Sequence, residues 1–311
     1  MKTAFLFSGQ GSQYPGMMKD LADKNQVSIA VFQIADESLG RSISELCFNG
    51  TKEELSLTQN TQPCVLAADL AAYEALSAYH IYPDAVAGFS LGEYGALAAA
   101  GVISYEDVFP LIQKRADFMQ EAVPVGTGAM AAVMKLDEEE VKSLCQEIEG
   151  YVEPANYNCP GQIVVSGEFH AVEQLVEIAK RRKIRAMMLP VSAPFHCRLM
   201  NSATEKLNEY LKRINFSQPS VPIYMNVDGY PAIDTDDILK KLTLQSNHPI
   251  RWEDTLRNIH YDGVDTFIEL GPGKTLAGFV RKTFSDEDVK IYNVSDQGSL
   301  ECTIATLKGE I

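Results

Sequence analysis

The segment Gly88-Phe89-Ser90-Leu91-Gly92 has the residue types and spacing of a nucleophile elbow, G-x-S-x-G. In such an elbow a strand turns sharply into a helix, so the serine stands exposed at the helix N-terminus and the glycines leave room for the backbone. An apolar stretch precedes the motif and an Ala-rich stretch to Ala100 follows it. The pattern predicts that Ser90 is a nucleophile. The alternative is a serine in a turn that has no chemical role.

A nucleophilic serine needs a base, and the sequence offers five histidines: His80, His170, His196, His248 and His260. We interpret four of them as ordinary surface or core residues. His196 differs because it ends the segment Val191-Ser192-Ala193-Pro194-Phe195-His196, where the chain passes from its middle section back to its outer section. No Asp or Glu stands in a recognisable triad context before it, so we expect a backbone carbonyl or an amide to orient the ring and fix its tautomer.

The outer parts of the chain must position these two residues, and they repeat one pattern of apolar strand, tight turn and helix. Strands are predicted at residues 3–7, 84–88 and 266–270, and each leads into a turn rich in glycine. Apolar strands that alternate with helices are typical of a parallel sheet that is covered on both faces.

The middle of the chain has a different rhythm, with predicted strands at 129–134, 152–158, 162–167 and 186–191 and helices at 137–148 and 171–182. The order β-α-β-β-α-β is the ferredoxin-like arrangement, and the stretch 124–128 is predicted to be its entry hinge. We therefore predict an α/β fold. An α/β-hydrolase-like parallel-sheet core (1–124 and 197–311) would carry an inserted ferredoxin-like subdomain (125–196), with a cleft where the two meet.

Composition narrows the classes of partner. Of 311 residues 46% are hydrophobic, yet no stretch approaches the roughly 18 consecutive apolar residues of a membrane helix. Six well-separated cysteines without a C-x-x-C pair indicate reduced thiols in a cytoplasm and no zinc site. The net charge of −15 argues against nucleic acid as a partner. An acidic protein partner would need a local basic patch; the run 180–185 supplies one, unless it is simply a solvated helix end.

Several motifs occur in an order that resembles a known family: Gly9-Gln10-Gly11-Ser12-Gln13, Thr58-Gln59-Asn60-Thr61-Gln62-Pro63, Gly88-Phe89-Ser90-Leu91-Gly92-Glu93, Asn156-Tyr157-Asn158, Pro194-Phe195-His196, Pro249-Ile250-Arg251-Trp252 and Glu269-Leu270-Gly271-Pro272-Gly273. The chain resembles malonyl-CoA:acyl carrier protein transacylases nearly end to end, and polyketide-synthase acyltransferase domains are relatives.

The resemblance implies roles for the matching positions. Ser90 is similar to the nucleophile and His196 to its base, while Gln10 and Leu91 correspond to the residues whose backbone N–H groups form the oxyanion hole. Arg115 is similar to the arginine that pairs with the malonyl carboxylate; from the sequence alone, a helix-surface arginine is the alternative. The other implied positions are Gln62, Met119, Phe195 and Phe89 around the acyl group, Asn158 and Gln245 as supporting amides, and Lys183 and Arg185 facing the carrier.

One position departs from the family, which usually has histidine where this chain has Phe89. That histidine is not the base, so activity should survive, but the fine acyl selectivity is left open. Phe195 resembles the malonyl-selective relatives rather than the methylmalonyl-selective ones.

The activity that the resemblance implies is transfer of malonyl from coenzyme A to the phosphopantetheine thiol of acyl carrier protein, through an ester on Ser90. The transfer would supply fatty acid synthesis, or polyketide synthesis in trans. No bound cofactor or metal is expected, since the coenzyme A thioester is a substrate. Two alternatives remain at this point. An esterase or thioesterase would have no use for the Arg115 cation, and a non-catalytic carrier-binding scaffold would not need both Ser90 and His196.

Overall fold

The computed structural model describes residues 2–124, 126–191 and 193–309. Residue 125, where the inserted subdomain is predicted to begin, and Ser192, before the predicted base, lie outside the described residues. The first part of the chain forms β1 (Thr3–Phe7), α1 (Lys19–Lys24), α2 (Gln26–Leu39), α3 (Ile43–Asn49), α4 (Lys52–Leu55), α5 (Thr58–Ser77), β2 (Ala85–Gly88), α6 (Gly92–Ala99) and α7 (Tyr105–Ala122).

The middle part forms β3 (Gly128–Met134), α8 (Glu138–Gln146), β4 (Val152–Cys159), β5 (Gln162–Glu168), α9 (Phe169–Arg181) and β6 (Arg185–Met188). The last part forms the 3-10 turn η1 (Arg198–Met200), α10 (Asn201–Leu211), β7 (Ile223–Tyr224), α11 (Thr235–Leu244), α12 (Trp252–Tyr261), β8 (Thr266–Leu270), α13 (Thr275–Thr283), β9 (Lys290–Val294) and α14 (Gln297–Leu307).

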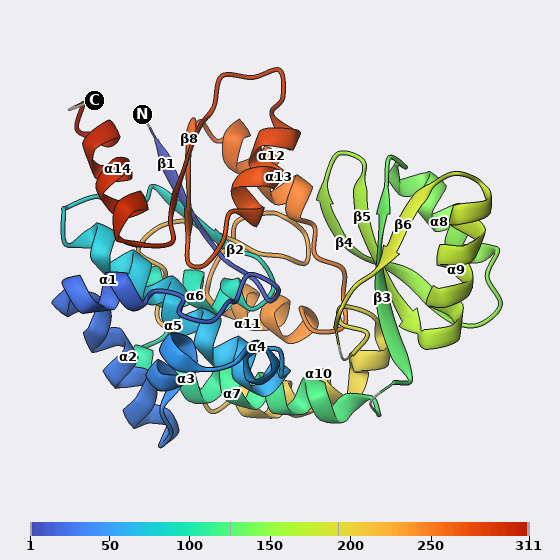
Figure 1. Cartoon of the computed structure of the whole chain (residues 1–311), viewed down its shortest axis with the longest axis horizontal. Coiled ribbons are helices and arrows are strands. Elements are labelled where there is room, and N and C mark those ends of the chain that lie inside the picture. Colours follow the sequence, from blue (N-terminus) through green and yellow to red (C-terminus); the bar gives the residue numbers. More distant parts are fainter. Residues whose placement is uncertain (1, 125, 192, 310–311) are drawn as a thin grey trace.

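The core is a parallel sheet of strand order β7-β2-β1-β8-β9. All five residues of β1 are buried, and successive side chains point to opposite faces. Phe5 and Phe7 pack into a cluster with α2, α5, α7 and α14, whereas Ala4 and Leu6 pack against α12 and α13. Both faces of the sheet are therefore covered, and Figure 1 shows the strands running between the two groups of helices.

The second sheet is antiparallel, of order β4-β5-β3-β6, and lies beside the core (Figure 1). Numbered within the insertion this order is 2-3-1-4, the ferredoxin-like arrangement. Along β3, Ala129, Ala131 and Val133 face α8 and α9, while Met130 and Ala132 face a cluster that includes Met119 of α7. One face of the sheet thus has its own helices, and the other packs on the core.

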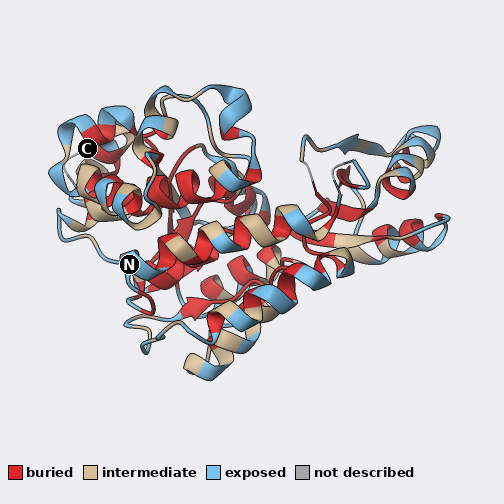
Figure 2. Cartoon of the chain, turned by 90° about the horizontal axis from the view of Figure 1, so that it is seen from below, coloured by how far each residue is buried: buried red, intermediate tan, exposed pale blue. Residues whose placement is uncertain are grey.

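The two parts are also joined by backbone. Ile250, just before α12, pairs with Asn156 of β4; the Tyr157 N–H donates to the Ile250 carbonyl at 2.9 Å and the Ile250 N–H to the Ala155 carbonyl at 2.8 Å. The Arg251 guanidinium lies 4.2 Å from the centre of the Tyr157 ring. Seen from below in Figure 2, the long α7 reaches from the core toward the subdomain with buried residues along one side.

The fold class predicted from the sequence is confirmed, and the differences are at element ends. The predicted strand 186–191 ends at Met188, two residues before Pro190, which has no N–H for the sheet. The helix predicted from 171 begins at Phe169. In the part of the chain that the structure describes, we find no helix with the length and apolar character needed to span a membrane.

Candidate active site

Ser90 is at the apex of a tight turn between β2 and α6. Its φ of +55° lies in the left-handed region that side chains rarely adopt. The flanking glycines make the turn possible: a Cβ on Gly88 would lie 1.9 Å from the Gly92 carbonyl oxygen, and a Cβ on Gly92 would lie 2.3 Å from the Phe7 carbonyl oxygen. The strand–turn–helix geometry of a nucleophile elbow is therefore present around Ser90.

Ser90 and His196 are in direct contact, although 106 positions separate them: the serine Oγ lies 2.7 Å from Nε2 of the imidazole. The other ring nitrogen, Nδ1, lies 2.9 Å from the Gln245 carbonyl oxygen. A carbonyl only accepts hydrogen bonds, so Nδ1 carries the proton and Nε2 is left as the acceptor for the serine hydroxyl. The imidazole is thus oriented by a backbone carbonyl, without an acidic residue.

The environment keeps His196 neutral. Burial, and then the charge of Arg115, lower its pKa from the usual value of 6.5 to about 3, against a smaller opposite effect of the Gln245 carbonyl. At neutral pH the free imidazole is therefore unprotonated and available as a base.

Arg115 is the third member of the cluster and comes from α7. It is 1% exposed, so the alternative of a helix-surface arginine is wrong. Its Nη1 donates to Gln62 Oε1 at 2.6 Å, and its Nη2 donates to Ser90 Oγ at 3.1 Å and to Gln245 Oε1 at 2.9 Å. All three of these hydrogen-bond partners are neutral, so the buried guanidinium retains a strong electrostatic demand for an anion.

Among the described residues no carboxylate forms an ion pair with Arg115, although the buried Glu93 carboxyl is close enough to interact with its charge. The Nε of Arg115 has no hydrogen-bond partner there. Gln62, on α5, also contacts Met119 of α7 with its Nε2 3.8 Å from the sulfur. The cation is therefore held in place by amides on two sides, close to the serine oxygen. This arrangement fits an incoming carboxylate that arrives together with the group that Ser90 attacks.

Gln10 and Leu91, the predicted oxyanion donors, follow β1 and β2. These two strands are parallel neighbours with Phe7 opposite Gly88, so their carboxyl ends meet at the same edge of the sheet. Neither the Gln10 nor the Leu91 backbone N–H donates to another group among the described residues. Unpaired N–H groups beside the nucleophile are what an oxyanion needs.

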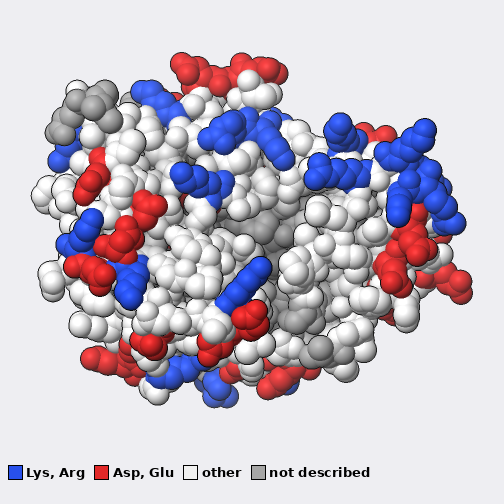
Figure 3. All heavy atoms as spheres, in the orientation of Figure 1, with Lys and Arg blue, Asp and Glu red and all other residues white. Residues whose placement is uncertain are grey.

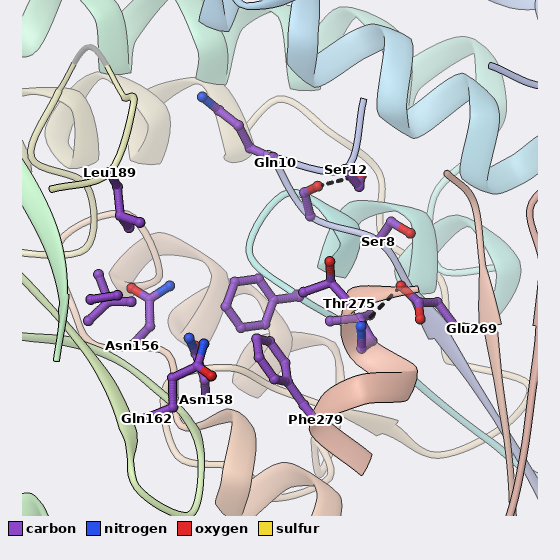
Figure 4. Close-up of a pocket in the computed structure, with 16 residues that line it drawn as sticks. Ser8, Gln10, Ser12, Asn156, Asn158, Gln162, Leu189, Glu269, Thr275 and Phe279 are labelled. Carbon is purple, nitrogen blue, oxygen red and sulfur yellow. Dashed lines mark hydrogen bonds between the residues drawn. The ribbon is translucent and has the colours of Figure 1, made fainter. Parts of the chain in front are cut away.

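A pocket lies between the loop that follows β1 (residues 8–12), the subdomain and α13, and Figure 4 shows the side chains that line it. Its polar side chains come from both parts of the chain and include Gln10, Asn156 and Asn158; its apolar wall includes Phe89 and Phe279. The Oδ1 atoms of both asparagines are buried without a hydrogen-bond partner among the described residues. The pocket thus combines an apolar wall with free hydrogen-bonding atoms, as many ligand sites do.

The remaining predicted positions are outside the hydrogen-bonded cluster of Ser90, His196 and Arg115. Phe195 is buried with Met119 where α7 meets the subdomain. Phe89 is half-buried, with its ring 5.4 Å from the Trp252 ring in an edge-on arrangement. Lys183 and Arg185 are exposed on the subdomain.

Two residues of the site were not assigned from the sequence. The Asn226 carboxamide accepts the Ser90 N–H at 2.8 Å and donates to the Gly88 carbonyl at 2.7 Å. Glu93 accepts the Asn226 N–H at 2.6 Å. Asn226 comes two residues after the short strand β7, which neighbours β2 in the parallel sheet. A polar residue that closely follows an apolar strand was the available signal.

The geometry can be compared with known proteins. The acyl transferase domain family matches residues 4–301. A malonyl CoA-acyl carrier protein transacylase of Bacillus subtilis (strain 168) is 44% identical over 99% of this chain and 98% of that protein. The crystal structure of a protein of that name from Clostridium perfringens has a TM-score of 0.95 at 42% identity, over 100% of this chain and 98% of that one.

The chain belongs to the malonyl CoA-acyl carrier protein transacylase family.

The family resemblance read from the sequence motifs is thereby confirmed, as is the prediction of an enzyme of this class. A third relative is a malonyl-transacylase solved in complex with its type II PKS acyl-carrier protein. It is 38% identical with a TM-score of 0.95, and the match covers 98% of this chain and 100% of that one. High coverage on both sides means that the likeness extends over the core and the inserted subdomain together.

Proposed function

We propose that this enzyme transfers malonyl from coenzyme A to acyl carrier protein through an ester on Ser90. The observation that carries the proposal is Arg115, a buried cation that donates to Ser90 Oγ at 3.1 Å while the same oxygen lies 2.7 Å from His196. Burying this cation costs desolvation free energy, and an esterase acting on uncharged acyl groups would gain nothing that offsets the cost. A scaffold without catalysis would need neither the serine–histidine contact nor the strained turn.

In the first half-reaction His196 Nε2 takes the Ser90 hydroxyl proton as Oγ attacks the thioester carbonyl. The N–H groups of Gln10 and Leu91 stabilise the oxyanion, each at roughly 3 kcal/mol. The C–S bond then breaks, and the coenzyme A sulfur takes the proton from His196. In the second half-reaction the carrier thiol gives its proton to His196 and attacks the ester. The C–O bond breaks, and Ser90 Oγ recovers the proton.

Coenzyme A and the carrier present the same phosphopantetheine arm, so one cleft serves both half-reactions. We place this arm in the pocket of Figure 4, where the Asn156 and Asn158 side chains supply hydrogen-bonding groups for its amides. The reaction as proposed needs no bound cofactor or metal. Its setting is fatty acid synthesis in the cytoplasm, where the free cysteines of the described residues suit a reducing medium; polyketide synthesis in trans is the second setting.

The test is the mass of the intact protein after brief exposure to malonyl-, methylmalonyl- and acetyl-CoA in competition. We expect mainly the malonyl adduct, and its disappearance when acyl carrier protein is added, with the malonyl group recovered on the carrier. Recovery of free malonate at the same rate would instead identify a thioesterase. A protein that acquires no adduct at all would be a scaffold.

Phe89 is predicted to tune selectivity without taking part in proton transfer. Its ring packs against Trp252 and lies 6.1 Å from that of Phe279, and a phenyl ring has no group that can accept a proton. We expect Phe89→His to keep kcat/KM for malonyl-CoA within about tenfold while changing the ratio of malonyl to methylmalonyl transfer. Phe89→Leu is the control, since it changes the volume without adding a hydrogen-bonding group. Complete loss of transfer in Phe89→His would show that the site depends on the phenyl ring.

Lys183 and Arg185 are predicted to guide the carrier. Arg185 begins β6, an edge strand of the subdomain, and Lys183 lies two residues before it. Both side chains are exposed, and neither is in an ion pair among the described residues. Figure 3 shows basic side chains on both sides of the hollow between the subdomain and the core. Because the protein carries a net charge of −15, an acidic carrier must approach through such a local positive surface.

Reversing both charges (Lys183→Glu with Arg185→Glu) should raise the apparent KM for carrier about threefold to tenfold at low salt, with a smaller change at high salt. Acylation of Ser90 by malonyl-CoA should not change. The control is Lys19→Glu with Lys24→Glu, on the exposed face of α1 at the opposite end of the molecule (Figure 1). Equal effects of the two pairs would mean that only the overall charge matters, and no effect of either would make 180–185 an ordinary solvated helix end.

A further inference from the structure

The carboxamide of Asn226 bridges the two sides of the nucleophile turn. Its Oδ1 accepts the Ser90 N–H at 2.8 Å, and its Nδ2 donates to the Gly88 carbonyl at 2.7 Å. Both groups lie outside the regular sheet and helix hydrogen bonds, because the backbone reverses direction between them. Asn226 is fully buried, so no water can substitute for it without rearrangement.

Asn226 is itself held by its backbone. Its N–H donates to Glu93 Oε2 at 2.6 Å, and its carbonyl accepts the Arg251 N–H at 2.7 Å. Glu93 is fully buried in the first turn of α6, the helix that begins directly after the nucleophile turn. The Glu93 side chain therefore ties Asn226, two residues after β7, to the first turn of α6, the helix that directly follows Leu91.

Asn226 and Glu93 together are called the clamp. The clamp is important because Ser90 has a φ of +55°, a conformation that a non-glycine residue keeps only when its surroundings enforce it. A small rotation of the turn would move Oγ away from His196 and would misalign the Leu91 N–H. Asn226 has no hydrogen bond to Arg115 or to the imidazole. Its Oδ1 also lies 3.4 Å from Nε2 of Gln245, the residue that contacts both of them. The two shorter side-chain contacts of Asn226 are both to the nucleophile turn, so its main influence on the reaction is exerted through the backbone of that turn.

We propose that Asn226, oriented by Glu93, is a positioning residue that fixes the nucleophile turn in its reactive conformation. The proposal deepens the acyl transfer proposed above and rests on it. It predicts a loss of acylation rate that is independent of which acyl group is offered, because the two shortest side-chain contacts of Asn226 are to the nucleophile turn and none is to Arg115.

The test is the rate constant of Ser90 acylation, followed by rapid-quench mass spectrometry at saturating malonyl-CoA and acetyl-CoA. Asn226→Ala should lower it about 10- to 100-fold for both donors by the same factor, with KM within about threefold. Asn226→Asp keeps an acceptor for the Ser90 N–H and should recover part of the rate. The matched control is Asn258→Ala, which removes another amide-to-backbone hydrogen bond, to the Gly229 carbonyl at 2.9 Å; it should change only thermal stability.

Variants of Glu93 provide a second test of the proposal. Glu93→Ala should slow acylation, and its effect should largely vanish in the Asn226→Ala background, as expected for residues that act in series. Glu93→Gln keeps an oxygen acceptor and should rescue the rate. Burial raises the pKa of Glu93 to about 8, opposed by the Asn226 N–H and by Arg115 and assisted by Asp228, so a neutral amide is close to the form present at pH 7.

Labelling of Ser90 by a fluorophosphonate separates failure of the clamp from failure of the proposed function. This reagent phosphorylates an activated serine with loss of fluoride and needs no acyl pocket. If the native enzyme is labelled but not acylated by malonyl-CoA, the acyl transfer proposal fails, and the labelling rates of the variants still test the clamp. Native rates of acylation and labelling in folded Asn226→Ala would overturn the clamp, as would a loss confined to malonyl-CoA. Should that variant fail to fold, native rates in Asn226→Asp and Glu93→Ala would overturn it equally.

Discussion

Ser90→Ala is expected to abolish the malonyl adduct and to lower transfer to the carrier by at least about four orders of magnitude. The reason is that no other group in the cluster can form the covalent intermediate: Arg115 and Gln62 have no nucleophilic atom, and His196 serves as the base. The substitution removes a single oxygen from a buried turn, so the fold should persist. The measurement is the intact mass after malonyl-CoA exposure, followed by peptide mapping of the segment around residue 90.

Cys197 is the internal check on this expectation, because it is the thiol next to the base. It is fully buried, its sulfur lies 3.1 Å from the Pro194 carbonyl, and burial raises the pKa of its thiol. It should therefore remain unmodified at neutral pH. An adduct that persists in Ser90→Ala and maps to Cys197 would refute the serine mechanism.

The rate of Ser90 acylation should depend on pH through the ionisation of His196. The pKa of His196 is lowered to about 3, so the imidazole stays neutral as the pH falls through 6.5, and protonation removes the base only near the lowered value. For acylation at low malonyl-CoA, kcat/KM should accordingly stay level from pH 8 to below 6. A decline centred near pH 6.5 would mean that the imidazole of the free enzyme is solvated and not buried, in contrast to its 3% exposure in the structure. His196→Ala should lose the plateau and about two to four orders of magnitude in rate.

What the sequence could predict was the local part of this site. The elbow around Ser90 can be recognised in one continuous segment of the sequence, because strand, turn and helix follow one another there. The βαββαβ order of the subdomain is similarly readable, since each element has its own periodicity. Element ends were less certain, as at β6, where Pro190 ends the strand earlier than its apolar pattern suggests.

The contacts that make the site reactive join residues far apart in the chain. Arg115 meets Gln245 across 130 positions, and Asn226 meets Ser90 across 136. No local pattern marks Arg115 as buried, because an arginine on an amphipathic helix usually faces water, and only the family resemblance singled it out. No family motif quoted above includes Asn226. Its position beside Ser90 depends on the pairing of β7 with β2, and β7 has just two residues, too few to show a strand pattern in the sequence.

The second large effect concerns Arg115, which we expect to determine which acyl group is accepted. Malonyl differs from acetyl by one carboxylate, and carrying that charge into the buried site is unfavourable unless a cation receives it. The planar guanidinium, already oriented by Gln62 and Gln245, offers charge and geometry together. Arg115→Ala should lower malonyl transfer by roughly two to three orders of magnitude, or about 3–4 kcal/mol of transition-state binding.

Acetyl transfer should change little in Arg115→Ala, or even rise. The Arg115 charge is the second cause of the lowered pKa of His196, so removing it makes the imidazole a stronger base. With malonyl-CoA bound to the native enzyme, the substrate carboxylate should offset the same charge, whereas acetyl leaves it unopposed. The cation thus has two effects with opposite consequences for the two donors, and the ratio of malonyl to acetyl transfer reports both.

The measurement is kcat/KM for both donors in the native enzyme, Arg115→Ala, Arg115→Lys and the control Lys114→Ala, which removes an exposed cation from the adjacent position of α7. Lysine keeps the charge but loses the fork, so it should recover only part of the malonyl activity. Lys114→Ala should match the native enzyme with both donors. Equal losses for malonyl and acetyl in Arg115→Ala would show that Arg115 only supports the buried amides around it, and the carboxylate would then have to be received elsewhere in the cleft.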